Sequence, residues 1–230
     1  MHLRVIGDVH AQIGFTLGRN KASYLDILSG CEFSVQLGDM GDKEAYEELN
    51  AHVDPRFHRF FAGNHDHYPF LPSHSLGDFG GRSIGGVNFF FVRGAQSGDK
   101  KQLQTLGKKL GKTLWYEEEQ LPLQMHNSIV ETYLESKPDL VLSHTCPASI
   151  VDLIRRYVVG RSRFSTSLGF REPSDTEILL QNMLERHRPK LWFFGHFHHD
   201  WSYLENGTEF RCIGELSFLD LPFDGGQEFQ

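Results

Sequence analysis

Seven side chains of the kinds that bind divalent metal ions follow five short apolar segments of this sequence. They are Asp8, His10, Asp39, Asn64, His144, His196 and His198. Oxygen and nitrogen donors without a thiolate suit Mn²⁺, Fe, Zn²⁺, Ni²⁺ or Mg²⁺, and we expect Mn²⁺ first. Seven donors are more than one ion needs, and the two oxygens of a single carboxylate can bridge two ions. The residue types therefore predict a site for two divalent metal ions in each chain.

The apolar segments that precede these residues are short, rich in Val, Leu, Ile and Phe, and end in glycine or serine. They span residues 3–7, 34–38, 60–63, 140–143 and 191–195. This composition is typical of buried β-strands. Side chains just past the end of a strand are held rigidly and still reach solvent, so sheet proteins commonly place their sites there. We therefore expect the five loops to gather at one edge of a sheet structure.

The order of the predicted elements indicates an α/β fold. In the first third of the chain, strand-like segments alternate with helix-like segments near 20–28 and 43–50. This alternation predicts a largely parallel sheet with helices on its outer face. Further on, the pairs Gly85-Gly86 and Asn206-Gly207 predict β-hairpins. Parallel units at the start and hairpins at the end suggest two mixed sheets packed face to face, with helices outside.

Three further helices are expected in the second half of the chain. The first covers about 117–135 and is interrupted at Pro122, and the second covers about 150–156. The third begins after Ser174, where Glu177 completes a capping box, and continues to about residue 188.

We expect a single domain over residues 1–230, because the predicted ligands spread from Asp8 to His198. Two irregular polar segments, about 95–114 and 157–173, are predicted to be cap or loop insertions. The formal charge is −7, from 23 basic and 30 acidic residues. This balance argues against a dedicated binder of long nucleic acids, whereas it is compatible with a short phosphorylated substrate.

The sequence gives no sign of a membrane partner. No segment approaches the roughly 18 consecutive apolar residues of a membrane span, and the first residues do not have the pattern of a signal peptide. The three cysteines, Cys31, Cys146 and Cys212, form no disulfide-type pattern, which indicates a reducing compartment. We therefore expect a cytoplasmic protein, with no prediction of its oligomeric state.

The motifs that carry the predicted ligands resemble those of a known family. In chain order they read GDVH (7–10), GDMGD (38–42), GNHD (63–66), SH (143–144) and GHFH (195–198). They are similar to the ordered motifs of the calcineurin-like metallophosphoesterase superfamily over most of the chain. The resemblance implies a four-layer αββα sandwich with a dinuclear metal site.

The resemblance also implies a role for each residue. Asp8, His10 and His198 would hold the first metal, Asn64, His144 and His196 would hold the second, and Asp39 would bridge them. His65 would be a catalytic histidine that binds no metal, oriented by Asp66, whose carboxylate would accept a hydrogen bond from its ring. Two cations would make hydroxide available near neutral pH for attack on phosphorus, and a protonated His65 could protonate the departing alkoxide.

Two departures from the family pattern bear on function. Ala11 stands where the family often has glycine, which affects backbone geometry more than chemistry. Lys43 and Glu44 replace the Arg-Gly pair of the protein-phosphatase branch. A lysine cannot reproduce the bidentate contact of an arginine with phosphate. We therefore predict a phosphoesterase for phosphate mono- or diesters, with a protein phosphatase or a nuclease as alternatives and an inactive binding scaffold as a weaker one.

A cluster of arginines indicates where the chain would recognise its substrate. Five arginines follow the His144 loop, at positions 155, 156, 161, 163 and 171. Arginine recognises phosphate oxygens through a planar fork of donors. We predict that Arg161 or Arg163 contacts a small phosphorylated substrate beyond its scissile phosphate, with Lys100-Lys101 as a second candidate.

Overall fold

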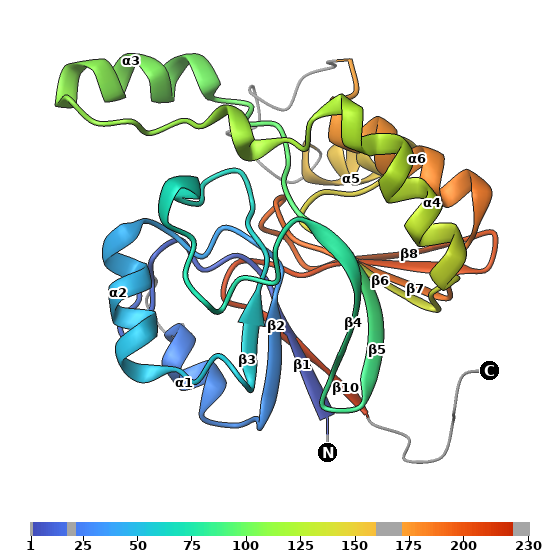
Figure 1. The fold of residues 1–230 in the computed structure, drawn as a ribbon, viewed down its shortest axis with the longest axis horizontal. Helices are drawn as coiled ribbons and strands as arrows, with labels where there is room; N and C mark the ends of the chain where they lie inside the picture. Colours follow the sequence, from blue (N-terminus) through green and yellow to red (C-terminus); the bar gives the residue numbers. More distant parts are fainter. Residues whose placement is uncertain (1, 18–21, 160–171, 223–230) are drawn as a thin grey trace.

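The chain folds around two β-sheets (Figure 1). The structure is a computed structural model that describes residues 2–17, 22–159 and 172–222. The four-stranded sheet has the order β10-β1-β2-β3, and the six-stranded sheet has the order β4-β5-β6-β7-β9-β8. The strands are β1 His2–Ile6, β2 Phe33–Gln36, β3 His58–Phe60, β4 Phe79–Ile84, β5 Val87–Val92, β6 Leu140–Ser143, β7 Leu191–Phe194, β8 Trp201–Glu205, β9 Thr208–Cys212 and β10 Phe218–Pro222.

Three buried apolar clusters explain why the strands have continuous apolar sequences. Leu3 and Val5 of β1 share the cluster between the two sheets with Phe89 of β5. Ile6 belongs instead to the cluster on the outer face of the four-stranded sheet, and Phe90 to the cluster on the outer face of the six-stranded sheet. Successive side chains of a strand point to opposite faces, so strands covered on both faces need apolar residues at nearly every position.

The helices cover the outer faces of the sheets. Those on the four-stranded sheet are α1 Tyr24–Leu28 and α2 Lys43–His52, and those on the six-stranded sheet are α4 His126–Ser136, α5 Ala148–Val159 and α6 Asp175–Arg186. Figure 1 shows the two groups of helices on opposite sides of the strands. The helix–sheet–sheet–helix order confirms the predicted four-layer αββα sandwich.

Strand directions determine where the predicted ligands lie. β1, β2 and β3 run parallel to one another, and so do β5, β6, β7 and β9, while β10, β4 and β8 are antiparallel to their neighbours. Both sheets are therefore mixed, as predicted. Each loop with a predicted ligand begins at the carboxyl end of a parallel strand, and carboxyl ends of parallel strands share one edge of a sheet.

The two predicted hairpins are confirmed. Ile84 pairs with Val87 across Gly85-Gly86, and Glu205 pairs with Thr208 across Asn206-Gly207. Both central residues of each turn have positive φ, 56° and 80° in the first and 49° and 87° in the second. This is the backbone geometry of the type I′ turn that suits the twist of a hairpin.

Several predicted helix boundaries were wrong. Helix α1 begins at Tyr24 because the Ser23 hydroxyl caps it, accepting a hydrogen bond from the Asp26 amide. The predicted helix over 117–135 is two 3₁₀ turns, Glu117–Glu119 and Leu123–Met125, before α4 begins at His126. Pro122 has no amide hydrogen to continue a helix through this stretch.

The polar segment 95–114 is more regular than we expected. It contains an eleven-residue helix, α3 Lys100–Leu110, which ends at Gly111 in the left-handed conformation. Figure 1 shows α3 projecting away from the two sheets. A short 3₁₀ helix, Tyr68–Phe70, follows the GNHD motif. None of the helices in the described ranges has the length and apolar character needed to cross a membrane.

A buried arginine fastens the last strand to the first. Arg4 of β1 donates two hydrogen bonds to the Asp220 carboxylate of β10, at 2.7 and 2.8 Å, and a third to the carbonyl of Ile27 in α1. Its guanidinium also lies 3.9 Å from the ring centroid of Phe218. Arg4 is 7% exposed, so the loss of its partner would leave a buried charge unpaired.

We predict that Asp220→Asn lowers the free energy of unfolding by about 1–2 kcal/mol, because the amide replaces a charge-assisted pair that is partly open to solvent. The hydrogen bonds of Arg4 hold the pKa of Asp220 below its usual value. The difference between wild type and variant is therefore complete above pH about 4 and shrinks as pH falls through the lowered pKa. Urea denaturation at pH 7 and pH 3 measures it. Asp139→Asn, which breaks an exposed pair with Lys190, serves as the control and should change little.

Candidate metal centre

Four of the predicted ligands converge on one point. The ligand atoms of Asp8, His10, Asp39 and His198 all lie within 4.8 Å of one another. The Nε2 atoms of His10 and His198 are 2.9 Å apart, and His198 Nε2 is 3.0 Å from Asp8 Oδ2. Two nitrogens at right angles on one ion, each about 2.1 Å from it, are about 3 Å apart. The spacing of the four side chains thus fits a common cation.

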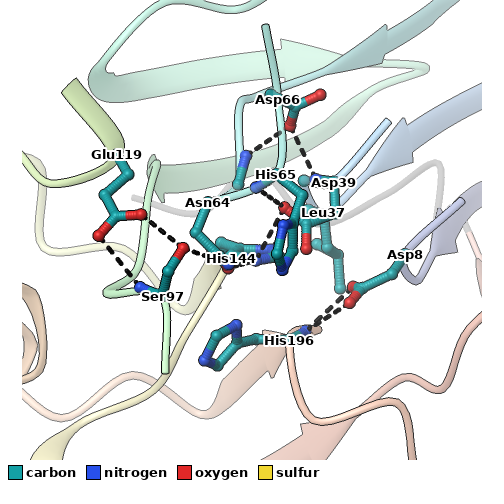
Figure 2. A network of polar contacts seen from close by, with 12 residues as sticks. Asp8, Leu37, Asp39, Asn64, His65, Asp66, Ser97, Glu119, His144 and His196 are labelled. Carbon is teal, nitrogen blue, oxygen red and sulfur yellow. Dashed lines mark hydrogen bonds and ion pairs between the residues drawn. The ribbon is translucent and has the colours of Figure 1, made fainter. Parts of the chain in front are cut away.

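The remaining predicted ligands lie on the other side of Asp39 (Figure 2). His144 Nε2 is 3.0 Å from Asn64 Oδ1 and 3.4 Å from Asp39 Oδ1. The His144 and His196 ring centroids are 5.1 Å apart. The other oxygen of Asp39, Oδ2, is 3.9 Å from His10 Nε2. One carboxylate therefore has one oxygen toward each group of ligands.

The tautomer of His144 follows from its second hydrogen bond. Its Nδ1 lies 2.8 Å from the carbonyl oxygen of Leu37. A carbonyl only accepts, so Nδ1 carries the hydrogen, and Nε2 of the neutral ring has a free lone pair. Burial would lower the pKa of His144, but the charge and hydrogen bond of Asp39 outweigh it and raise the pKa to about 9. The Nε2 atom of His144 is thus placed to bind a proton or a metal ion.

An unpaired buried oxygen supports a cation at this position. Asp39 is 1% exposed, and its Oδ2 atom accepts no hydrogen bond from the described part of the chain. Burial would raise the pKa of Asp39, but His144 and its other histidine neighbours hold the pKa well below the usual range. A buried, ionised carboxylate oxygen without a donor is costly unless a cation neutralises it. The residues present therefore fit divalent metal ions.

Small residues and strained backbone bring the ligands this close. A Cβ atom on Gly63 would clash with the Asp39 carboxylate and the His144 ring, and one on Gly195 would clash with the Asp8 carboxylate. Four predicted ligands have left-handed backbone: His10, Asp39, His196 and His198, with φ between 49° and 66°. Non-glycine residues in this region cost free energy and cluster at functional sites. Ala11, the departure from the family pattern, is also left-handed, with φ 62°.

His65 lies at the solvent-exposed side of the ligands. Its side chain is exposed, and its ring centroid is 5.6 Å from that of His10. The His65 backbone N–H donates a 2.7 Å hydrogen bond to Asp39 Oδ1. The backbone bond fixes the position of His65 beside the ligands while its ring faces solvent, where a substrate can reach it.

The predicted role of Asp66 in orienting His65 is wrong. The Asp66 carboxylate is 1% exposed and accepts four hydrogen bonds, from the backbone N–H groups of Asp39, Gly41 and Gly63 and from the Tyr46 hydroxyl, at 2.7 to 3.0 Å. A carboxylate has about four lone-pair sites. All are used by groups other than the His65 ring, so Asp66 holds the loops that carry the ligands.

Three residues that lie behind the predicted ligands were not predicted from the sequence. Tyr46 binds Asp66, as described above. Ser97 accepts a hydrogen bond from Asn64 Nδ2, and the buried Glu119 accepts from Ser97. Ser97 follows the carboxyl end of β5, an apolar strand like those before the predicted ligands. This position was the only feature of the sequence that could have indicated a role for Ser97 in the site.

Arg161 and Arg163 lie outside the described residues, as does most of the segment 157–173. Arg155 lies in α5, where its side chain is 3.7 Å from the Glu177 carboxylate of α6. Lys100 lies over the Trp115 ring at 3.7 Å from its centroid. Contact of Arg161 or Arg163 with substrate stays a prediction.

We predict that Asp66→Asn lowers the free energy of unfolding of the metal-free protein by about 2–4 kcal/mol, since an NH₂ group would face two buried donors. Tyr46→Phe removes one of the four hydrogen bonds and also the one that its hydroxyl accepts from the His67 N–H, and should cost about 1–2 kcal/mol. Urea denaturation in the presence of a chelator compares the two variants with wild type. Equal stability of Asp66→Asn and wild type would contradict the role assigned to Asp66.

Comparisons with known proteins agree with this geometry. The sequence matches the family model for calcineurin-like phosphoesterases over residues 1–200. No curated protein matches it. A dimetal phosphatase from Danio rerio has a similar structure, with 14% identity over 96% of this chain and 91% of its own, and a TM-score of 0.55. The phosphopantetheinyl hydrolase of Mycobacterium tuberculosis has 13% identity over 94% and 90% of the two chains, with a TM-score of 0.52.

A third similar structure is that of GAP50, described as the anchor in the inner membrane complex of Plasmodium. It has 14% identity over 94% of this chain and 72% of its own, and a TM-score of 0.50. At these identities the similar structures establish the fold alone. The family model covers most of the sequence and includes every motif that carries a predicted ligand. The chain therefore belongs to the calcineurin-like phosphoesterase family.

Proposed function

We propose that the protein hydrolyses phosphate mono- or diesters of small molecules with the help of two divalent metal ions, Mn²⁺ being the leading candidate. The observation that carries the proposal is the position of Asp39. Its carboxylate is buried between two groups of ligands, with Oδ1 near His144 and Oδ2 toward His10. Asp8, His10 and His198 would hold one ion, and Asn64, His144 and His196 the other.

Each group of residues has a distinct task in this mechanism. When bound, two divalent cations supply Lewis acidity, which makes hydroxide available near neutral pH and neutralises charge on the phosphoryl group. His65, on the exposed side of the ligands, donates a proton to the departing oxygen. Asp66 acts through the backbone, because it keeps the Asp39 and Gly63 amides in place.

The alternatives differ in what they require of the site. A protein phosphatase of the related branch uses an arginine where this chain has Lys43, and Lys43 is exposed at the start of α2, 3.6 Å from Glu47. A nuclease is disfavoured by the net charge of −7. An inactive scaffold has no need of buried metal ligands, yet the full set of predicted ligands is present. A panel of monoester, diester and nucleotide substrates assayed with Mn²⁺ separates these functions.

We also propose a cytoplasmic location. The observation in its favour is that Cys31, Cys146 and Cys212 are free thiols, two of them buried. Free thiols are the usual state in a reducing compartment.

We predict that wild-type protein reconstituted with excess Mn²⁺ binds two ions per chain and that Asp39→Asn lowers the occupancy of both. The reason is that an amide has one oxygen and no charge, so it cannot bridge two cations as a carboxylate does. Elemental analysis after removal of unbound metal measures the ratio. At most one ion in the wild-type protein would contradict the dinuclear proposal.

We predict that His65→Ala keeps both metal ions but lowers kcat by roughly 10²–10⁴-fold, the usual contribution of a positioned acid or base. An ester with a poor leaving group is the sensitive substrate, because its departing oxygen needs the proton. His52→Ala, which removes an exposed histidine at the end of α2, is the matched control. A rate near that of wild type on the poor leaving group would refute the role of His65.

A further inference from the structure

The side-chain amide of Asn64 can bind a metal ion in only one of its two orientations. The Oδ1 atom is a ligand, whereas the Nδ2 group carries two hydrogens and repels a cation. The two orientations have nearly the same shape, and the terminal torsion is soft. Asn64 is 3% exposed, so neighbouring protein groups must determine which end faces His144.

Ser97 supplies an acceptor for the nitrogen end. Asn64 Nδ2 donates a 3.1 Å hydrogen bond to Ser97 Oγ, while Asn64 Oδ1 lies 3.0 Å from His144 Nε2 (Figure 2). If the amide were reversed, its oxygen would face Ser97, and its NH₂ group would face the position assigned to the metal ion. The preference for the observed orientation therefore depends on Ser97 acting as an acceptor.

Glu119 determines that Ser97 acts as an acceptor. The hydroxyl of Ser97 donates a 2.6 Å hydrogen bond to Glu119 Oε2, and its backbone N–H donates a 3.1 Å bond to Oε1. An ionised carboxylate only accepts. The hydroxyl hydrogen of Ser97 is thereby directed to Glu119, and the lone pairs of Ser97 remain for Asn64. Hydrogen bonds thus run in one direction, from Asn64 through Ser97 to Glu119.

Burial makes this chain of hydrogen bonds costly unless it is complete. Ser97 is 5% exposed and Glu119 is 1% exposed. Burial raises the pKa of Glu119, and the hydrogen bonds from Ser97 counteract that effect. A buried carboxylate at the end of a polar chain destabilises a fold unless its hydrogen bonds are satisfied.

We propose that Ser97 and Glu119 are positioning residues that hold the Asn64 amide with its oxygen toward the metal centre. This inference rests on the proposed function, since it assigns Asn64 to one of two metal ions. Second-layer hydrogen bonds of this kind commonly set metal affinity.

Ser97 and Glu119 also lie at the base of the segment that carries α3, so their hydrogen bonds hold the two ends of this segment together. This segment, residues 98–118, projects away from the sheets, forms α3 and returns to them (Figure 1). The Ala95 N–H also donates a 3.1 Å hydrogen bond to the Glu119 carbonyl oxygen. The two hydrogen bonds from Ser97 to the Glu119 carboxylate therefore help to close the base of this segment and also orient Asn64. A purely structural role would be confined to closing this base.

The Mn²⁺ affinity of variants distinguishes a role in positioning Asn64 from a purely structural role. Ser97→Ala and Glu119→Gln each interrupt the chain, the first by removing the hydroxyl and the second by placing an NH₂ group against a donor. Asn64→Ala identifies the ion that Asn64 binds. Ser97→Thr keeps the hydroxyl, and Glu118→Gln makes the same chemical change on the exposed neighbour of Glu119. Metal-free protein is titrated with Mn²⁺ by calorimetry, and the melting temperature of each metal-free variant is recorded.

We expect Ser97→Ala and Glu119→Gln to lower the affinity for one of the two Mn²⁺ ions by roughly 10–100-fold. This should be the ion whose affinity Asn64→Ala also lowers, and the affinity for the other ion should be unchanged. Ser97→Thr and Glu118→Gln should bind both ions as wild type does. Two results would overturn the positioning role while the proposed function stands. In one, the variants melt at lower temperature but bind both ions with the affinity of wild type; in the other, their affinity for both ions falls equally. If the wild-type protein binds fewer than two ions, the dinuclear centre and this inference fail together.

Discussion

Backbone amides of the loops after β2 and β3 share one acceptor, the buried carboxylate of Asp66. Its hydrogen bonds to the Asp39 and Gly63 amides fix the starting points of the segments that carry Asp39 and Asn64. Its bond from Tyr46 connects the same loops to α2. Together with the hydrogen bond from the His65 N–H to Asp39, these bonds join the two loops to one another. The geometry on both sides of Asp39 therefore depends on an aspartate that binds no metal in the proposed centre.

Burial of several carboxylates at one place explains the electrostatics of the site. Asp8, Asp39 and Asp66 are all nearly inaccessible to solvent, and isolated buried charges are costly. Asp66 is stabilised by its four donors, and Asp8 by the His196 backbone N–H and by His198. Asp39 keeps one oxygen without a donor among the described residues. The neighbouring carboxylates raise the pKa of His144 and His198. Metal ions would replace the protons on these two rings, so metal binding and their ionisation would be coupled.

Strain in the backbone is concentrated where the ligands lie. His10, Asp39, His196 and His198 adopt left-handed conformations, which are sparsely populated by residues other than glycine. Aspartate tolerates them better than most residues, and so does histidine. Such conformations persist only where the surrounding structure determines them strongly. In this fold, two sheets buried on both faces provide that rigidity, because the strands leading into the loops cannot shift without disturbing the core.

The sequence by itself determined the strands, the parallel units at the start, the hairpins and the set of side chains predicted to be metal ligands. Short apolar segments, type I′ turn residues and ligand motifs are local properties that can be recognised within a few residues. The sequence also indicated that Ala11 would matter for the backbone, and its left-handed φ of 62° agrees. Helix boundaries were less well predicted. The interruption at Pro122 was expected, whereas the 3₁₀ turns on either side of it and the Ser23 cap depend on local hydrogen bonds that periodicity does not reveal.

Tertiary structure alone decided what stands behind the ligands. The family resemblance implied a contact between Asp66 and the adjacent His65 ring, yet the partners of Asp66 are three backbone amides and the Tyr46 hydroxyl, up to 27 residues away. Ser97 and Glu119 are of residue types common on surfaces, and no motif connects them with Asn64. Hydrogen bonds between distant loops arise from the packing of the two sheets, which brings the ends of strands together. The residue types of the predicted ligands can therefore be recognised in the sequence, whereas their orientation depends on contacts that exist only after folding.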